Sequence, residues 1–371
     1  MENAAARTSE VRYAVIGQGY VAQAAVLPAF EHARRNSRLA AIVSGDAAKR
    51  KALARRYDAP AYRYEDFTRC VAEAGVDAAY IALPNDQHRD WTVRCARLGL
   101  HVLCEKPLAL DERECRTMIA ACRRHRVKLM TAYRLHFERA TLSAIEAVRG
   151  GEVGEAKLFV SSFTNRVEPP NIRLEADQGG GTLYDIGIYC INAARHLFEA
   201  EPTQAFAMTA GRSRGGSVEE SATCMLRFPG DRLATFCLSF GTDKTSEYRI
   251  VGTRGSLRVE PGYELAKGLE HHYKHGGSKS VVAYGKRDQF AAELLYFSDC
   301  ILGDREPQPS GEEGLADVRV IRALYRSARS GRPVKLAARP MRTQPSPRNE
   351  KTRPPVARMP KLVHATPPSG G

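Results

Sequence analysis

The sequence predicts an α/β protein with two domains: a parallel sheet covered by helices, followed by a largely antiparallel sheet. The chain has 371 residues, which is about the length of two domains. Short apolar runs alternate with helical patterns as far as residue 134, and this alternation is typical of parallel sheets. From residue 204 onwards, alternating strands follow one another across short turns, which indicates antiparallel pairing with one covered face.

Apolar runs in the first domain predict buried strands over 11–17, 39–43, 77–83, 101–104 and 127–133. Helical patterns fill the intervals, over 20–35, 46–57, 86–98 and 111–125. Pro84 and Pro107 end two of the strands, because proline cannot donate a hydrogen bond to a sheet. Because a helix connects each strand to the next, we expect one parallel sheet with right-handed crossovers.

The pattern changes after residue 135. The predicted elements are a helix over 138–149, a strand over 156–164, a helix opened by Gly179-Gly180-Gly181, strands over 204–212, 221–228, 233–240 and 247–259, and helices over 289–302 and 312–330. We therefore expect an N-terminal tail over 1–10, a first domain over 11–134 and a second domain over 135–336.

The last segment, residues 337–371, differs in composition from the rest. It holds eight of the chain's 20 prolines, and its seven Lys and Arg against Glu350 give it a net charge of +6 out of +14. Such a segment buries too little apolar surface to offset its ordering entropy, so we expect a disordered, basic, Pro-rich tail. The charge that remains on the body of the chain fits an anionic ligand, and we expect no nucleic-acid partner.

Membrane and secretory signals are not evident. No run approaches the roughly 18 apolar residues of a membrane helix, and residues 1–10 lack the apolar core of a secretory signal. The nine cysteines are odd in number, and none has Cys-x-x-Cys spacing. We expect free, buried thiols in a reducing cytoplasm and no membrane association.

Gly17-x-Gly19-x-x-Ala22 follows a predicted strand and opens a predicted helix, as a dinucleotide fingerprint requires. Gly17 permits a tight turn, and Gly19 lets the backbone approach a pyrophosphate. The helix N-terminus adds free N–H groups and partial positive charge. The fingerprint predicts a dinucleotide site, in which we include Tyr20 and Val21.

The residues after the second strand bear on the choice between NADP and NAD. Ser44 stands where an NAD site usually has an acid. Lys49 and Arg50 open the next helix and can meet a 2′-phosphate, which favours NADP. Asp46 leaves NAD open because its carboxylate could bind a ribose hydroxyl, although a helix cap is the better interpretation.

Two further motifs suggest a family. Pro84-Asn85-x-x-His88 and Glu105-Lys106-Pro107 each follow a predicted strand. Together they resemble motifs of the Gfo/Idh/MocA oxidoreductases, most closely glucose–fructose oxidoreductase and related NADP-linked sugar dehydrogenases. Residues 132–137 and 180–190 are similar to other signatures of that subgroup. The resemblance covers about residues 11–336 and implies a Rossmann domain followed by a C-terminal α/β domain with a large open sheet.

The resemblance also implies roles for particular residues. Lys106 is expected to be the catalytic or substrate-orienting lysine, and Asp185 the substrate-binding acid. Tyr189 is expected to donate and accept the proton at the reacting oxygen. The expected cofactor site is completed by Pro84, Asn85, His88, Glu105, Lys106 and Arg134, with capping or packing as the alternative for His88 and a substrate contact as the alternative for Arg134.

The spacing of these residues supports the same grouping. Asp185 and Tyr189 lie four residues apart, on one face of a helix, and Asn192 and His196 extend that face. A phenol with a pKa of about 10 is a poor base at neutral pH unless a cation stabilises the phenolate. Lys106 would provide that cation if the fold brings it close.

Two other regions bear on metal binding and on substrate specificity. His271–His275 resembles a metal cluster superficially, but it lacks a partnering carboxylate pattern and is expected in a loop, so we expect no metal. Substrate specificity is expected to lie in loops over 165–178 and 262–288.

The sequence thus predicts an NADP-dependent oxidoreductase acting on a sugar, a sugar lactone or a cyclic polyol. The alternatives are a dihydrodiol dehydrogenase, a sugar transhydrogenase that retains its cofactor, and a non-catalytic NAD(P)-binding regulator. An open sheet with an apolar face, carried by strands such as 233–238, predicts a homodimer or homotetramer.

Overall fold

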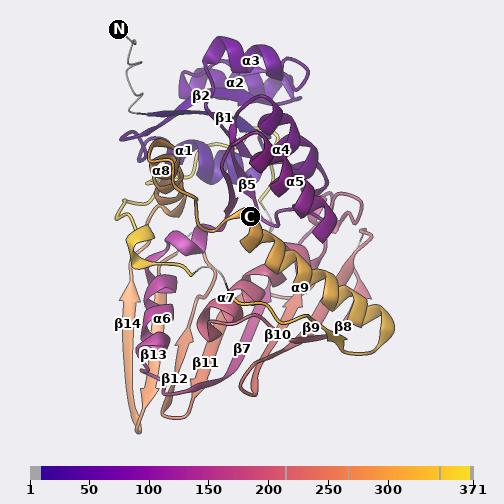
Figure 1. Ribbon diagram of the computed structural model, residues 1–371, viewed down its shortest axis with the longest axis vertical. Coiled ribbons are helices and arrows are strands. Elements are labelled where there is room, and N and C mark those ends of the chain that lie inside the picture. The colour runs from indigo at the N-terminus through magenta and orange to yellow at the C-terminus, as the bar shows by residue number, and fades with distance from the viewer. Residues whose placement is uncertain (1–9, 214, 266, 342–343, 368–371) are drawn as a thin grey trace.

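The computed structural model describes residues 10–213, 215–265, 267–341 and 344–367. It contains two sheets, stacked one above the other in Figure 1. The first has the strand order β3-β2-β1-β4-β5-β6, and the second has the order β14-β13-β12-β11-β7-β10-β9-β8-β15. The predicted α/β class, with a parallel sheet followed by a mostly antiparallel one, is confirmed.

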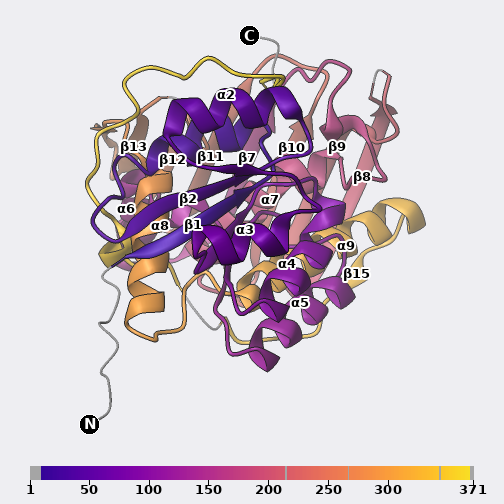
Figure 2. The ribbon, with the colours of Figure 1, turned by 90° about the horizontal axis from the view of Figure 1, so that it is seen from above.

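Every pairing in the first sheet is parallel. Its strands are β1 (Val11–Ile16), β2 (Ser37–Val43), β3 (Ala61–Tyr62), β4 (Ala78–Ile81), β5 (His101–Glu105) and β6 (Leu129–Ala132). The helical segments between them are η1 (Ala22–Val26), α1 (Leu27–Ala29), α2 (Ala47–Tyr57), α3 (Phe67–Ala74), η2 (Asn85–Gln87), α4 (His88–Arg97) and α5 (Glu112–Arg124). Figure 2 looks down on this sheet, with α2 on one side and α3, α4 and α5 on the other.

The helix predicted over 20–35 is shorter and less regular than expected. Its middle, η1, is wound as a π-helix, and α1 ends at Ala29. Pro28 has no N–H to continue the ladder of helical hydrogen bonds, which accounts for the irregular winding beside it. The short strand β3 and the helix α3, which buries Phe67 and Cys70, were not expected from the sequence.

Helix α8 (Gln289–Leu302) corrects one expectation. The sequence places it in the second domain, but in the structure its apolar side chains join the core of the first sheet. Tyr13 on β1 and Ser298 on α8 hydrogen-bond through their hydroxyls at 2.7 Å. Figure 1 shows α8 beside α1. Because α8 is apolar around most of its circumference, it can fill a face that the helices of the first domain leave uncovered.

The second sheet is antiparallel except for the parallel pair β7 and β10. Its strands are β7 (Ala156–Thr164), β8 (Gln204–Arg212), β9 (Glu219–Phe228), β10 (Arg232–Ser239), β11 (Thr245–Gly252), β12 (Gly255–Val259), β13 (Leu269–His275), β14 (Ser278–Tyr284) and β15 (Val334–Lys335). The other elements of this half are η3 (Arg134–Phe137), α6 (Arg139–Arg149), η4 (Ile172–Leu174), η5 (Leu183–Gly187), α7 (Ile188–Phe198) and α9 (Gly311–Ser330).

Two expectations about these strands need correction. The strand predicted over 247–259 is a hairpin of β11 and β12, which turns at residues 253–254. The segment 262–288, expected to be a loop, contains the hairpin of β13 and β14. His271–His275 therefore lies in a strand. Histidine, lysine and serine in this hairpin mask the alternation of apolar residues that marks most strands.

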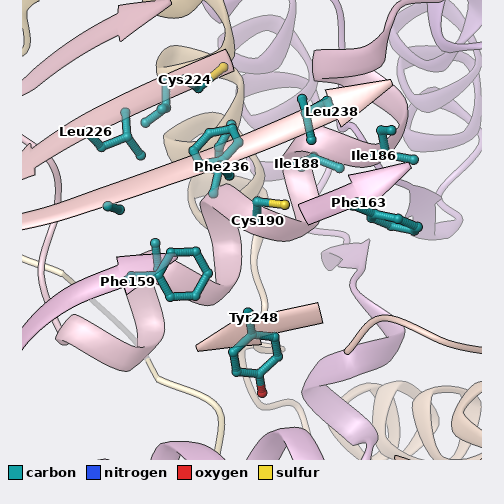
Figure 3. Close-up of a cluster of buried hydrophobic side chains, with 14 of the residues drawn as sticks. Phe159, Phe163, Ile186, Ile188, Cys190, Cys224, Leu226, Phe236, Leu238 and Tyr248 are labelled. Atoms are coloured by element: carbon teal, nitrogen blue, oxygen red, sulfur yellow. The ribbon is translucent and has the colours of Figure 1, made fainter. Parts of the chain in front are cut away.

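The helices cover one face of the second sheet. Figure 3 shows Phe159, Leu226 and Phe236 of the sheet packed together with Ile188 and Cys190 of α7. The strands alternate, so the opposite face exposes other apolar side chains, which include Leu158, Val160, Met208, Met225 and Leu233. None of the helices among the described residues is long and apolar enough to cross a membrane.

The C-terminal residues also differ from the expectation of disorder over 337–371. Within the described part, residues 344–367 follow the surface of both domains and include the short helix η6 (Pro347–Asn349). Asn349 is buried. In Figure 2 this yellow segment passes from the side of α6 to the side of α2. Its many prolines restrict the unfolded chain, so that ordering the segment costs less entropy than its composition suggests.

Candidate functional site

A cleft of about 450 Å³ opens at the carboxyl ends of the central strands of the first sheet. β1 lies between β2 and β4 in that sheet, which is the switch point where α/β proteins bind ligands. Most of the expected cofactor residues line this cleft: Gly17, Gly19, Tyr20, Val21, Ser44, Lys49, Pro84, Asn85, Glu105 and Lys106.

The two fingerprint glycines fit a dinucleotide. Gly17 has a φ of +89°, and a Cβ there would lie 2.4 Å from the carbonyl oxygen of Ala82, so only glycine is accommodated. A Cβ on Gly19 would meet nothing within 4 Å. The backbone at Gly19 therefore borders open space, where a pyrophosphate can approach the start of the helix.

Asp46 caps a helix, as the sequence predicts. Its Oδ1 accepts a hydrogen bond from the backbone N–H of Lys49 at 3.0 Å, and its Oδ2 lies 2.8 Å from Nδ1 of His364. The Lys49 N–H and then His364 lower the pKa of Asp46 to about 2. Both carboxylate oxygens thus have partners within the protein, which leaves Asp46 less available to a ribose hydroxyl.

Arg50 departs from its expected place. Its Nη1 donates a hydrogen bond to the backbone carbonyl of Ser44 at 2.7 Å, and Arg50 does not line the cleft. Lys49 does line the cleft, and burial lowers the pKa of its ammonium group. Lys49 is therefore the cation in better position for a 2′-phosphate.

A second cavity, of about 270 Å³, adjoins the cleft. The two spaces share the lining residues Tyr20, Val21, Glu105, Lys106, Arg173 and Asp185. Lys106 follows β5 in the first domain, whereas Asp185 lies in η5 of the second. The junction of the two spaces is therefore built by both domains.

Lys106 and Asp185 are paired at this junction. Nζ of Lys106 donates to the backbone carbonyl of Asp185 at 3.0 Å and lies 3.6 Å from its Oδ1. Nε of Arg173 donates to Oδ2 of Asp185 at 2.9 Å. Burial raises the pKa of Asp185, but the charges of Arg173 and Lys106 outweigh burial and hold it below its usual value. The carboxylate is therefore ionised at neutral pH.

Tyr189 lies one turn after Asp185 and lines the second cavity. Nζ of Lys106 lies 4.7 Å from the centroid of the Tyr189 ring, and Cζ of Arg134 lies 5.0 Å from it. Both cations are within the range of a cation–π contact. The fold thus brings together Lys106, Asp185 and Tyr189, as the sequence predicts, and places two positive charges beside the phenol.

Arg134 and His88 do not lie in the dinucleotide cleft. The buried guanidinium of Arg134 donates to the backbone carbonyl of Tyr263 at 2.6 Å and to Oε1 of Gln289 at 2.8 Å, and Arg134 lines the second cavity. The imidazole of His88 is fully buried. Its ring nitrogens lie 2.9 Å from the carbonyl oxygen of Pro107 and 3.0 Å from that of Leu83.

The position of His88 has a physical reason. As the first residue of α4, it points into the core beneath the loops that follow β4 and β5. Burial lowers the pKa of His88, so its neutral ring has one N–H and donates to one of the two carbonyls while packing between the loops that carry Asn85 and Lys106. His88 thus acts through those neighbours and does not border the cleft.

The polar face of α7 reaches the cavity only through its first turn. Further along, Nδ2 of Asn192 donates to Oδ2 of Asp317 at 2.8 Å. Nε2 of His196 lies 3.0 Å from Oε1 of Glu313. Both side chains join a buried network on α9 and do not line the second cavity. The even spacing along the helix gave no indication that α9 presents acids to it.

Some residues of the site were not expected from the sequence. Arg173, in the loop over 165–178, carried no motif, and its role follows only from its contact with Asp185. Lys244, Glu264, Lys286 and Arg287 also line the second cavity. The described residues contain no group of three or more His, Cys, Asp or Glu side chains placed to hold a metal.

The glycine-rich run that begins at Gly179 packs against the first domain. Nδ2 of Asn85 donates to the backbone carbonyl of Gly179 at 2.8 Å. Gly179 has a φ of +79°, and a Cβ there would lie 2.3 Å from Cδ2 of Leu110. Only glycine, which has no side chain, therefore fits at this position, where the loop that precedes Asp185 packs against the first domain.

Two family models match the chain. The oxidoreductase family with an NAD-binding Rossmann fold, Gfo/Idh/MocA, matches residues 11–133. The C-terminal domain of the same family matches residues 141–258. The first region contains Lys106, and the second contains Asp185 and Tyr189, so the matched regions together hold three residues that line the second cavity.

Several known proteins are similar over most of their length. An NADP-linked D-xylose 1-dehydrogenase from Haloarcula marismortui is 30% identical over 341 residues, which cover 89% of this chain and 94% of that protein. The structure of an aldose–aldose oxidoreductase from Caulobacter crescentus has a TM-score of 0.83 and 37% identity, and the match covers 88% of this chain and 100% of that chain. A 3-ketoreductase from Actinomadura kijaniata, solved with NADP, has a TM-score of 0.78 and 26% identity over 86% and 98% of the two chains.

Proposed function

This chain belongs to the Gfo/Idh/MocA oxidoreductase family, and from this premise we propose that it is an NADP-dependent sugar oxidoreductase. It transfers a hydride between the nicotinamide and a CH–OH carbon of a small sugar, sugar lactone or cyclic polyol. The relatives with printed activities support this choice, since they include an NADP-linked xylose dehydrogenase and a 3-ketoreductase solved with NADP.

The observation that carries the proposal is the junction of the two cavities. The cleft fits a dinucleotide, and the adjoining cavity meets it only where Lys106, Asp185 and a few neighbours line both spaces. A substrate in the second cavity then has its reacting carbon beside the cofactor. Such proximity is what a hydride transfer requires.

Lys106, Asp185 and Tyr189, which all line the second cavity, have distinct tasks. Bound NADPH supplies the hydride in the reducing direction. Tyr189 donates its phenolic proton to the carbonyl oxygen of the substrate, and it takes the proton back in the oxidising direction. The ammonium group of Lys106, 4.7 Å from the ring centroid, stabilises the phenolate that forms. Asp185 holds Lys106 in place and accepts a hydrogen bond from a substrate hydroxyl.

The cavity favours a small, hydroxyl-rich substrate. Its volume of about 270 Å³ lies below the lower end of the range of about 300–1,000 Å³ that is usual for ligand pockets. Its walls include charged and polar groups such as Lys106, Asn165 and Asp185. A monosaccharide or cyclic polyol fits this combination of small size and many hydrogen-bonding groups.

The test is a dehydrogenase assay of the purified protein with NADP and NAD against aldoses, inositols and dihydrodiols, followed by the absorbance of reduced nicotinamide. The proposal expects turnover with NADP and at least one aldose or cyclic polyol. Turnover with dihydrodiols alone would move the assignment to a dihydrodiol dehydrogenase. Dinucleotide binding with no turnover on any substrate would favour a non-catalytic regulator.

A second candidate activity is transhydrogenation between two sugars with the cofactor retained. It is supported by the 37% identity to the aldose–aldose oxidoreductase. The discriminating observation is whether the purified protein carries NADP through gel filtration and converts one aldose while reducing another. A plain dehydrogenase releases its cofactor and needs added NADP in stoichiometric amounts.

We also propose that the protein assembles as a homodimer or homotetramer through the second sheet. Leu158 and Leu233 are neighbours across β7 and β10, and both are exposed together with Val160 and Met225. An apolar row of this kind is costly to leave in water. Light scattering at micromolar concentration tests the assembly, and a monomer would contradict it.

Nine free cysteines, eight of them buried, support a reducing compartment such as the cytoplasm.

A further inference from the structure

The C-terminal segment, defined as residues 350–367, is attached to both domains. At its start, the backbone N–H of Asp288, which caps α8, donates to the carbonyl of Arg353 at 3.4 Å. The preceding residue, Asn349, is buried. The segment lies outside both regions that match the family models. Figure 2 shows it running along the edge of the molecule toward α2.

The far end of the segment pairs with a buried side chain of the first domain. The backbone N–H of Val363 donates to Oε1 of Gln23 at 2.8 Å, and Nε2 of Gln23 donates to the carbonyl of Val363 at 2.9 Å. Gln23 is fully buried in η1. A buried amide needs partners, and the segment occupies both ends of this one. His364 adds the contact to Asp46 at 2.8 Å.

Between and beyond these attachments, the segment lines the substrate cavity. Pro355, Val356, Met359 and Pro367 all border it, along with the residues of the two domains. All four are apolar, whereas much of the remaining wall is charged or polar. The segment therefore limits the space that a substrate can occupy but offers no side-chain hydrogen bond to an additional hydroxyl-bearing ring.

We propose that the C-terminal segment is a specificity-determining wall, which restricts the enzyme to substrates of about monosaccharide size. The inference rests on the proposed function, since it concerns the substrate of the same cavity. A larger sugar has to displace Val356 and Met359, and displacement breaks the pairing between Val363 and Gln23. A monosaccharide leaves these contacts intact.

The test compares the intact chain with a chain that ends at Glu350. Both are assayed with NADP on aldose monosaccharides and on disaccharides with a free reducing end. We expect truncation to raise the disaccharide-to-monosaccharide ratio of kcat/KM by about tenfold or more, the range over which small changes in pocket size alter discrimination. Met359→Ala should move the ratio in the same direction. Val363→Pro, which removes the N–H that Gln23 accepts, should do so without altering the wall itself. Lys361→Ala, at an exposed position of the same segment, is the matched control and should not change the ratio.

An unchanged ratio in the truncated chain and in Met359→Ala, with monosaccharide turnover retained, overturns the proposal. A second measurement does not depend on turnover. Asn165 lines the cavity, and Asn165→Cys in a Cys237→Ser background gives a thiol to label with small and bulky maleimides. Truncation should raise the rate at which the bulky maleimide labels this thiol several-fold, and the rate for the small maleimide much less. If the bulky maleimide labels the intact and the truncated chain at equal rates, the proposed wall is contradicted. This result does not depend on turnover, so the absence of any sugar substrate would count against the proposed function alone.

Discussion

Lys106 and Tyr189, from different domains, meet at the wall of the second cavity, with Nζ of Lys106 4.7 Å from the centroid of the phenol ring. The lysine is held there by the backbone carbonyl and carboxylate of Asp185. Arg134 lies on the same ring, with its Cζ 5.0 Å from the centroid. Two positive charges from the first part of the chain therefore lie beside the phenol of Tyr189.

Lys106→Ala should lower kcat by about 10²–10⁴-fold, the range for groups that assist general acid–base catalysis. NADP binding, measured by fluorescence titration, should weaken much less. The comparison of kcat with KM is the sharper readout, because loss of a group that assists the chemical step should lower kcat more than it raises KM. Lys51→Ala, on the exposed surface of α2, serves as the control for loss of a positive charge. A kcat close to that of the wild type in Lys106→Ala would show that the lysine does not assist the chemical step.

Cofactor choice should depend on Ser44 and Lys49. The wild-type protein should prefer NADP over NAD by at least about tenfold in kcat/KM, the equivalent of one charge-assisted hydrogen bond. Ser44→Asp should reduce or invert the preference, because a second carboxylate would repel the 2′-phosphate. Lys49→Ala should weaken NADP selectively. Arg50→Ala should have the smaller effect, since Arg50 is bonded to the carbonyl of Ser44. Equal use of NAD and NADP by the wild type would refute this assignment.

Glu293 should make stability depend on pH. It is fully buried, and its Oε1 has no hydrogen-bond partner within the described residues. Burial, followed by the charge of Glu105, raises the pKa of Glu293 well above its usual value. The folded protein thus keeps a proton that the unfolded chain releases above its pKa of about 4.3. The contribution of Glu293 to stability is fully present below that pH and is lost as pH rises.

The effect of Glu293→Gln on the free energy of unfolding should therefore become more stabilising, relative to the wild type, as pH rises. Between about pH 5 and about pH 8, the stability of the variant relative to the wild type should increase, with a slope of at most about 1.4 kcal/mol per pH unit. Urea unfolding at a series of pH values measures it. Glu152→Gln, at an exposed position, should show no such trend. A relative stability that falls with pH would mean that Glu293 is ionised in the folded protein.

Arg195 should be essential to the stability of the second domain. It is fully buried and contacts Glu201 at 2.6 Å, Glu313 at 2.7 Å and Asp317 at 2.5 Å. Arg195→Met leaves these carboxylates buried without their cation, which should cost about 3–5 kcal/mol.

The matched control is Arg149→Met, because Arg149 pairs with Glu199 on the surface at 2.7 Å. That change should cost under about 1 kcal/mol. The midpoints of urea unfolding compare the two variants. A similar, small loss for both would show that the buried network does not stabilise the domain.

The sequence predicted the elements with strong periodic signals and the residues within motifs. The first parallel sheet and the fingerprint glycines follow from local patterns, whereas the roles of Lys106 and Tyr189 were implied by the family resemblance and their meeting depended on the fold. The hairpin of β13 and β14 did not, because its polar side chains hide the alternation of a strand. Composition alone also misjudged the C-terminal segment, whose order depends on a partner, Gln23, more than 300 residues away in the chain.

The sequence could not predict the role of residues that depend on tertiary contacts. Arg173 belongs to no motif, and only the fold brings it to Asp185. His88 is part of a motif, but the motif gave no information about direction, and its ring turns into the core. Helix α8 returns to the first sheet although it follows the second in sequence. Such pairings are set by packing across the whole molecule, which periodicity does not encode.

The most direct test of the account is the rate of hydride transfer in Tyr189→Phe, measured in a single turnover with NADP and the best aldose or polyol found. Removal of the phenolic oxygen should slow that step by about 10²–10⁴-fold, while the affinity for NADP stays near that of the wild type. Phenylalanine keeps the ring beside Lys106 and Arg134, so the packing of the site is preserved. A single-turnover rate close to that of the wild type would contradict the assignment of Tyr189 as the proton donor and, with it, the proposed mechanism.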